Sequence, residues 1–142
     1  MTRDRLAPAR TGLRWLLMIG YGVVGIVHLR SPDAFLPIVP GWVPLPRTTV
    51  LVTGACEIAG AVALGMPRLR WLAGVMLATY AVCVYPANIK HAIDGVAVGG
   101  VHLGAWYHVP RLAFQPVLVW AALFAGGATS WPWRRGSARI GS

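Results

Sequence analysis

Four apolar runs, each about the length of a membrane-spanning helix, constrain the fold of this chain more than any other feature. They cover residues 13–30, 48–66, 70–88 and 111–129. An α-helix needs about 20 mostly apolar residues to cross the hydrocarbon core of a bilayer. A mean hydropathy of +0.60 with only 12% charged residues is also too apolar for a soluble domain of this length. The sequence therefore predicts an all-α, four-helix transmembrane bundle that forms one domain over residues 1–142 and contacts the lipid bilayer.

The basic residues lie at the ends of these runs, so they indicate topology and no nucleic-acid partner is expected. Nine lie on the side of the chain ends, mostly in the basic tails 1–11 and 133–142: Arg3, Arg5, Arg10, Arg14, Arg68, Arg70, Arg134, Arg135 and Arg139. Four lie on the other side: Arg30, Arg47, Lys90 and Arg111. By the positive-inside rule, this imbalance predicts that both termini are cytoplasmic (N-in/C-in) and that the two longer connections face outward.

One carboxylate, Glu57, lies near the middle of the second run, and no other acidic residue lies inside an apolar run. A charged side chain at the centre of a membrane helix costs about 2 to 3 kcal/mol, so it usually faces the protein interior and has a partner. On a helix, Glu57 shares a side with Thr53, Gly54 and Gly60, where a neighbouring helix can pack closely. Glu57 is therefore the candidate catalytic residue. The alternative is a hydrogen-bonded packing residue without chemistry.

The remaining polar candidates lie toward the outward side. Helical spacing puts Tyr21 and His28 on one face of the first helix, and Arg111 and Gln115 on one face of the fourth. If these faces converge with Asn88, they form an outward-opening ligand pocket floored by Glu57. Arginine is long enough to reach inward, so Arg111 is the expected partner of the carboxylate.

Two segments on the outward side contain prolines that limit helix formation. The connection 31–47 has five prolines, which exclude a long helix, and is apolar enough to fold over the outer end of the bundle as a semi-rigid cap or to lie in the membrane interface. Pro86 is expected to break or kink the third helix, with Asn88 and Lys90 as donors to the freed carbonyls.

Three other features of the sequence do not predict a functional site. Gly20 to Gly25 match G-x-G-x-x-G inside an apolar run, where no strand precedes the glycines, so the match predicts helix packing and not nucleotide binding. Cys56 and Cys83 are single thiols in different helices, so they are expected to be small packing residues. The four histidines lie on the outward side without a recognisable ligand spacing, and no metal site is expected.

An ordered set of residues resembles the DoxX-like family of small bacterial four-helix membrane proteins. The set runs through the chain: His28, Pro32, Phe35, Ile38-Val39-Pro40, Leu45-Pro46, Gly54-x-x-Glu57, Pro86-Ala87-Asn88-Ile89, Arg111-Leu112 and Gln115. The resemblance implies a multi-pass protein of the bacterial cytoplasmic (inner) membrane whose relatives are linked to thiosulfate:quinone oxidoreduction and to thiol systems. It also implies that His28, Glu57, Asn88, Arg111 and Gln115 are the polar site residues. This sequence departs from the thiol-linked relatives in having no paired cysteines, so direct dithiol chemistry is not expected.

Three functions stay open on the sequence. The first is a redox-associated component that binds a quinone or another apolar small molecule, works with a membrane redox partner protein and uses Glu57 for the proton. The second is a non-enzymatic partner or assembly subunit whose polar interior specifies helix pairing. The third is an intramembrane acid catalyst that isomerises or cyclises a lipid-like substrate.

Overall fold

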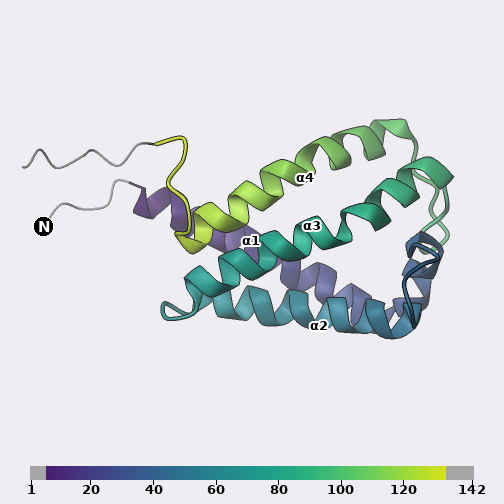
Figure 1. Ribbon diagram of the computed structural model, residues 1–142, viewed down its shortest axis with the longest axis horizontal. Coiled ribbons are helices and arrows are strands. Elements are labelled where there is room, and N and C mark those ends of the chain that lie inside the picture. Colours follow the sequence, from purple (N-terminus) through teal and green to yellow (C-terminus); the bar gives the residue numbers. More distant parts are fainter. Residues whose placement is uncertain (1–5, 134–142) are drawn as a thin grey trace, which may run out of the picture.

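The computed structural model describes residues 6–133, and in this part of the chain four α-helices form an antiparallel bundle (Figure 1). The helices are α1 (Ala7–Arg30), α2 (Pro46–Gly65), α3 (Arg70–Asp94) and α4 (Ala105–Gly126), and a short 3-10 helix, η1, covers Pro32–Ile38. All four α-helices are long and apolar enough to cross a membrane, which is the architecture of a multi-pass membrane protein. The predicted all-α four-helix bundle is confirmed.

The helices form a ring in which each one packs against two others. α1 packs mainly against α2 and α3 mainly against α4, while contacts of α2 with α3 and of α1 with α4 close the ring. α2 and α4 therefore lie diagonally opposite. Both chain ends leave at one end of the bundle, the termini end, and η1 lies at the opposite end, the cap end (Figure 1).

Two arginines of α1 close the termini end by binding carbonyls at the end of α4 and in the segment that follows it. Arg14 Nε donates to the carbonyl of Ala125 at 2.8 Å, and Arg10 Nη2 donates to that of Thr129 at 3.2 Å. Cations are favourable at a helix C-terminus, where four carbonyls lack intrahelical donors. Five of the arginines behind the predicted sidedness lie outside the described residues: Arg3, Arg5, Arg134, Arg135 and Arg139.

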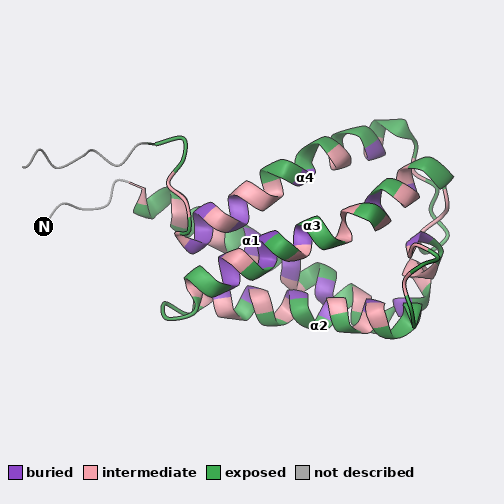
Figure 2. Ribbon diagram, in the orientation of Figure 1, coloured by how far each residue is buried: buried purple, intermediate pink, exposed green. Residues whose placement is uncertain are grey.

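The core is built mostly from small residues, because the helices approach one another closely. Leu64, Leu77 and Phe124 are the largest fully buried side chains. Around them lie buried alanines: Ala61, Ala73, Ala78, Ala121, Ala122 and Ala125. Small residues let helix backbones pack closely. In a membrane this close packing drives helix association, because lipid provides no hydrophobic force between the helices. Figure 2 shows buried segments on the sides that face neighbouring helices.

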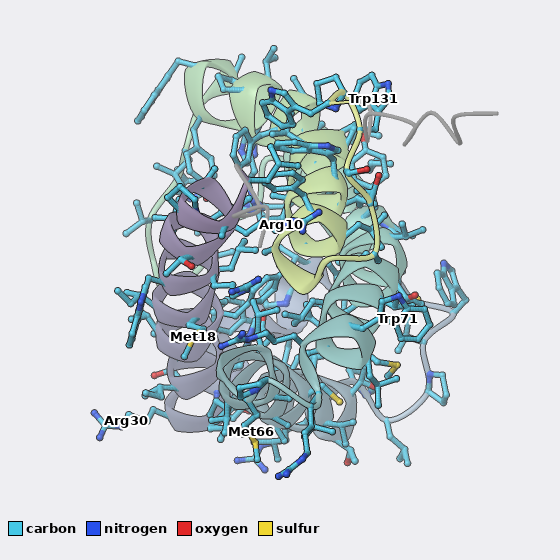
Figure 3. The ribbon with its side chains drawn as sticks, turned by 90° about the vertical axis from the view of Figure 1, so that its left-hand side faces the viewer. Arg10, Met18, Arg30, Met66, Trp71 and Trp131 are labelled. Carbon is cyan, nitrogen blue, oxygen red and sulfur yellow. The ribbon has the colours of Figure 1, made fainter. Side chains whose placement is uncertain are left out.

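Large apolar side chains cover the outside of the bundle. They include Trp15, Ile19, Val62, Trp71, Met76 and Val82, each more than half exposed. Figure 3 looks at the termini end and shows Trp71 pointing away from the helices. An apolar exterior on all sides suits contact with lipid and would be unfavourable in water.

Two helices extend further at the cap end than their apolar runs predict. α3 was expected to end near residue 88 but continues through Pro86 to Asp94, and α4 begins at Ala105 instead of 111. A proline removes one backbone donor, which a membrane helix tolerates when neighbouring groups satisfy the freed backbone. The carbonyl that Pro86 frees is that of Val82, and the Gln115 amide donates to the adjacent carbonyl of Ala81.

The segment 31–47 folds onto the cap end, as predicted. η1 contacts α1, α2 and α3, and the carbonyl of Pro37 accepts a hydrogen bond of 2.8 Å from Lys90 Nζ. Lys90 also pairs with Asp94 at 2.6 Å, so its expected role as a donor to carbonyls freed by Pro86 was wrong. Asp33 and Arg47 pair at 3.0 Å across the base of the segment.

Candidate functional site

Glu57 is buried between three helices, and side chains from both neighbours of α2 bind its carboxylate. Glu57 is 3% exposed. His28 Nδ1 from α1 lies 2.7 Å from Oε2, and the Tyr80 hydroxyl from α3 donates to Oε1 at 2.9 Å. When Glu57 is ionised it can only accept, so both neighbours donate to it. The expectation that Glu57 faces the interior and has partners is confirmed.

The close contact of α1 with α2 explains why His28 reaches this carboxylate. Gly25 and Gly54 face one another, and a Cβ added to Gly25 would lie 2.7 Å from the carbonyl oxygen of Gly54. Such a distance leaves no room for any side chain at either position. Since His28 follows Gly25 by three residues and Glu57 follows Gly54 by three, the same contact brings imidazole and carboxylate together.

Tyr21 extends the site deeper into the bundle. Its ring meets that of Tyr80 edge to face, with centroids 6.1 Å apart, and its hydroxyl is buried without a hydrogen-bond partner. At the other end, the ring of Phe35 from η1 covers His28 at a centroid distance of 4.2 Å. We call Tyr21, His28, Glu57 and Tyr80 the Glu57 cluster. It contains four groups that can carry a proton, ordered from beneath the cap toward the middle of the bundle.

Arg111 does not pair with Glu57, so that expectation was wrong. Arg111 Nη2 donates to Asn88 Oδ1 at 2.6 Å, and Nη1 lies 3.0 Å from His91 Nδ1. The physical reason is the order of the helices around the ring, because α4 lies diagonally across from α2. An arginine on α4 therefore meets α3 first.

A second polar group thus forms between α3 and α4, which we call the Arg111 cluster. Asn88 Nδ2 donates to Gln115 Oε1 at 3.2 Å, and the rings of His91 and His108 meet edge to face at 4.5 Å. The six residues predicted for one site are therefore divided. Tyr21, His28 and Glu57 lie in the first cluster, and Asn88, Arg111 and Gln115 lie in the second.

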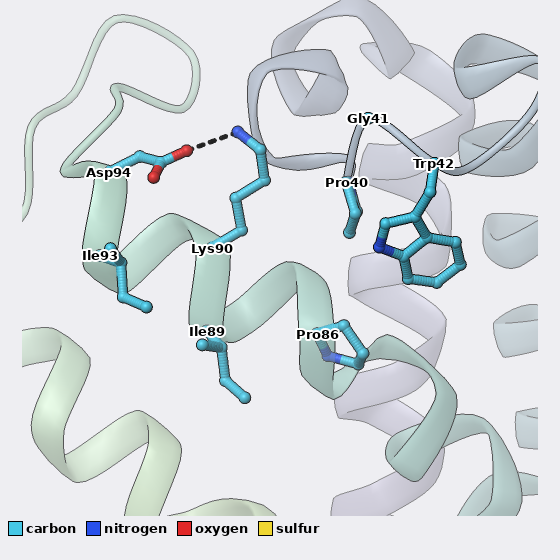
Figure 4. Close-up of a pocket in the computed structure, with 8 residues that line it drawn as sticks. All are labelled: Pro40, Gly41, Trp42, Pro86, Ile89, Lys90, Ile93 and Asp94. Atoms are coloured by element: carbon cyan, nitrogen blue, oxygen red, sulfur yellow. Dashed lines mark hydrogen bonds and ion pairs between the residues drawn. The ribbon is translucent and has the colours of Figure 1, made fainter.

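The carboxylate of Glu57 does not lie open to the cap end as expected, because Glu57 is buried beneath His28, which Phe35 of the cap covers in turn. One surface hollow of about 420 Å³ lies instead between the cap and the outer part of α3 (Figure 4). Its walls include Trp42, Pro86 and the paired Lys90 and Asp94. A second hollow, of about 410 Å³, lies along the cap-end half of α4. Glu57 lines neither of these two hollows.

Three residues of the two clusters were missed in the sequence. Tyr80 lies in an apolar run without a charged neighbour to mark it. His91 and His108 were assigned to an irregular loop, although His91 follows Asn88 by three residues and His108 precedes Arg111 by three. If the predicted helices had been longer, these spacings would have placed His91 on the same face as Asn88 and His108 on the same face as Arg111.

The cysteines and histidines complete the inventory of reactive side chains. Cys56 and Cys83 are free and exposed on α2 and α3, so they form no disulfide with each other and are not part of the buried core. His102 is exposed and its Nδ1 lies 3.2 Å from the carbonyl of Gly95. Within residues 6–133, no three histidine, cysteine or acidic side chains come together as metal ligands.

The comparisons with known proteins give a family but no function. Residues 17–125 match a family described as a domain of unknown function (DUF8561), and this range contains every member of both clusters. Neither the search of curated proteins nor the search of solved structures found a match.

Proposed function

The chain belongs to the DUF8561 family, and from its Glu57 cluster we propose that it is a redox-associated membrane component that exchanges protons with a quinone-like ligand. Reduction of a quinone to a quinol takes up two protons and two electrons. The cluster supplies proton-carrying groups, and a membrane redox partner protein supplies the electrons. The proposal includes a bacterial cytoplasmic membrane and a kinship with DoxX-like proteins, which the ordered residues from His28 to Gln115 support.

The observation that carries the proposal is the chain of hydrogen-bonding groups in the Glu57 cluster. His28 lies beneath the cap, Glu57 accepts from both His28 and Tyr80, and Tyr21 lies against Tyr80. A general acid or base must lie within hydrogen-bond reach of the group with which it exchanges a proton, and each consecutive pair from His28 to Tyr80 meets this requirement.

The buried hydroxyl of Tyr21 is the group that fits a ligand carbonyl. It has no partner among the described residues, and a buried donor without an acceptor is unfavourable by about 1 to 3 kcal/mol. A quinone carbonyl would accept this hydrogen bond. Its apolar tail would lie among the helices or in the lipid, both of which are apolar here.

The test is mass spectrometry of the small molecules that co-purify with the protein in mild detergent. Wild type is compared with Glu57→Gln and with Asp33→Asn, a matched acid-to-amide control in the exposed cap. We expect wild type and the control to retain a quinone that Glu57→Gln retains about tenfold less, a difference of about 1.4 kcal/mol. Equal retention by all three proteins, or no quinone in any of them, would contradict the proposal.

A second candidate function, a non-enzymatic partner subunit, rests on a different observation. Both oxygens of Glu57 already have protein donors from two other helices, which is what a polar group that specifies helix pairing requires. This function predicts that Glu57→Gln assembles normally and leaves the cell phenotype intact. Loss of the phenotype at a normal protein level would exclude it. The third function considered above, an intramembrane acid catalyst, has no comparable support from the contacts.

A further inference from the structure

The Arg111 cluster contains more hydrogen-bond donors than acceptors. A guanidinium can only donate, so His91 Nδ1 must accept from Arg111, and the ring hydrogen of His91 lies on Nε2. Both ring nitrogens of His108 are buried without a hydrogen-bond partner. Both histidines are at least nine-tenths buried, at 3% and 5% exposure. Buried donors without acceptors are rare in proteins, which points to a missing acceptor here.

The same cluster has a positive charge without a counter-ion. The three carboxylates in residues 6–133 are already paired: Asp33 with Arg47, Asp94 with Lys90, and Glu57 with His28. The partners of Arg111 are neutral, an amide oxygen and an imidazole nitrogen. Two of the five guanidinium donors are therefore used, and the others remain for an anion.

A hollow on the lipid-facing side reaches this arginine. It has a volume of about 410 Å³ and is lined by Arg111 together with apolar and aromatic side chains: Trp106, Tyr107, Pro110 and Phe114. Trp106 is 74% exposed and Phe114 57% exposed, so the hollow opens sideways from α4. Tryptophan and tyrosine are typical of the depth at which lipid head groups meet acyl chains. A charged end next to an apolar channel suits an amphipathic anion.

We propose that Arg111, positioned by its contacts with Asn88 and His91, binds the phosphate of an anionic phospholipid whose acyl chain lies in the hollow along α4. Arginine recognises phosphate through paired N–H donors, which gives orientation as well as charge. Neither Glu57 nor His28 takes part, so this site is independent of the quinone proposal.

The test is native mass spectrometry of delipidated protein with phosphatidylglycerol or phosphatidylcholine of identical acyl chains. Wild type is compared with Arg111→Gln and with Arg47→Gln, a matched control at an exposed ion pair in the cap. We expect wild type and the control to retain one phosphatidylglycerol about tenfold more strongly than phosphatidylcholine. Arg111→Gln should lose this preference. Retention without a preference in wild type, or an unchanged preference in Arg111→Gln, would overturn the proposal.

Two further arms separate the alternatives. Trp106→Ala changes only the exposed rim of the hollow, so it should weaken lipid retention while the midpoint of thermal unfolding stays unchanged. Unchanged lipid retention in this variant would contradict the acyl-chain position. Inorganic phosphate at millimolar concentration should not displace the lipid, because it gains nothing from the apolar hollow. Displacement would identify a site for free anions and overturn the lipid assignment.

Discussion

The two tyrosines of the Glu57 cluster differ in whether their hydroxyl has a hydrogen-bond partner. Tyr80 donates to the carboxylate at 2.9 Å, whereas the hydroxyl of Tyr21 is buried and unpartnered. Removing a hydrogen bond to a charged group costs about 1.5 to 3 kcal/mol, but removing an unsatisfied buried polar group costs nothing and relieves its desolvation. The hydroxyl of Tyr80 therefore stabilises the cluster, whereas the proposed role of the Tyr21 hydroxyl is to bind the ligand.

Tyr80→Phe is therefore expected to lower the free energy of unfolding by about 1.5 to 3 kcal/mol, while Tyr21→Phe leaves it unchanged or raises it. Unfolding in mild detergent, followed by circular dichroism, measures both. If the quinone proposal holds, Tyr21→Phe also loses quinone without losing stability. Equal destabilisation by both variants would mean that the hydroxyl of Tyr21 has a partner in the membrane.

The partners of Glu57 also show what the sequence can predict at this scale. It predicts that a single carboxylate in an apolar run faces inward, since the energetic reason is local to one helix. The choice between His28 and Arg111 as partner depends on which helices are neighbours. Both residues lie at the cap side of a helix, but α1 packs against α2 and α4 does not, and only the assembled ring distinguishes them.

At the scale of elements, the glycine contact between α1 and α2 fixes how closely these two helices pack. The G-x-G-x-x-G letters in α1 contain three glycines, yet only Gly25 meets another helix. A Cβ at Gly20 or Gly22 would have nothing within 4 Å, whereas at Gly25 it would overlap the backbone of Gly54. A backbone atom cannot move aside as a flexible side chain can.

Gly25→Ala is accordingly expected to destabilise the bundle by about 1 to 3 kcal/mol, the usual result of overpacking. Because α1 and α2 must separate, it should also lengthen the His28–Glu57 contact and reduce quinone retention. Gly22→Ala, three residues away in the same helix, is the control and should cause no loss of stability. The same unfolding measurement compares them, and a tolerated Gly25→Ala would show that the helices pack less closely than described.

The ends of the elements were harder to predict than their existence. Hydropathy located all four spans, because each must be apolar for about 20 residues. The same criterion ended α3 too early and started α4 too late, since the extra turns contain polar residues that face each other across the two helices. His91 and His108 therefore looked like loop residues, although they lie on the two helices and their rings meet.

At the scale of the whole molecule, the bundle differs between its two ends. Its largest buried side chains, Leu64, Leu77 and Phe124, lie in the half toward the termini end, whereas the Arg111 cluster and both hollows lie toward the cap end. The proposed lipid site and both hollows therefore lie in one half of the bundle. Which leaflet this is depends on the sidedness of the chain.

The sidedness is predicted by arginines that are mostly in the two tails. Among residues 6–133, the termini end has Arg10, Arg14, Arg68 and Arg70, and the cap end also has four basic residues, so the described part alone is balanced. The excess comes from Arg3, Arg5, Arg134, Arg135 and Arg139. Cytoplasmic tails are thus expected to hold the cap end on the outer side.

Cysteine labelling in intact cells tests this orientation. Cys56 and Cys83 are free, so both can be replaced by serine without breaking a disulfide, and a single cysteine can then be introduced at Gly41 in the cap or at Met66 in the turn between α2 and α3. A membrane-impermeant maleimide should label Gly41→Cys directly, and Met66→Cys only after permeabilisation. The opposite pattern would contradict the predicted sidedness. Because the described part is balanced, replacing the five tail arginines by glutamine should make both positions accessible from outside, which would show that the tails alone orient the bundle.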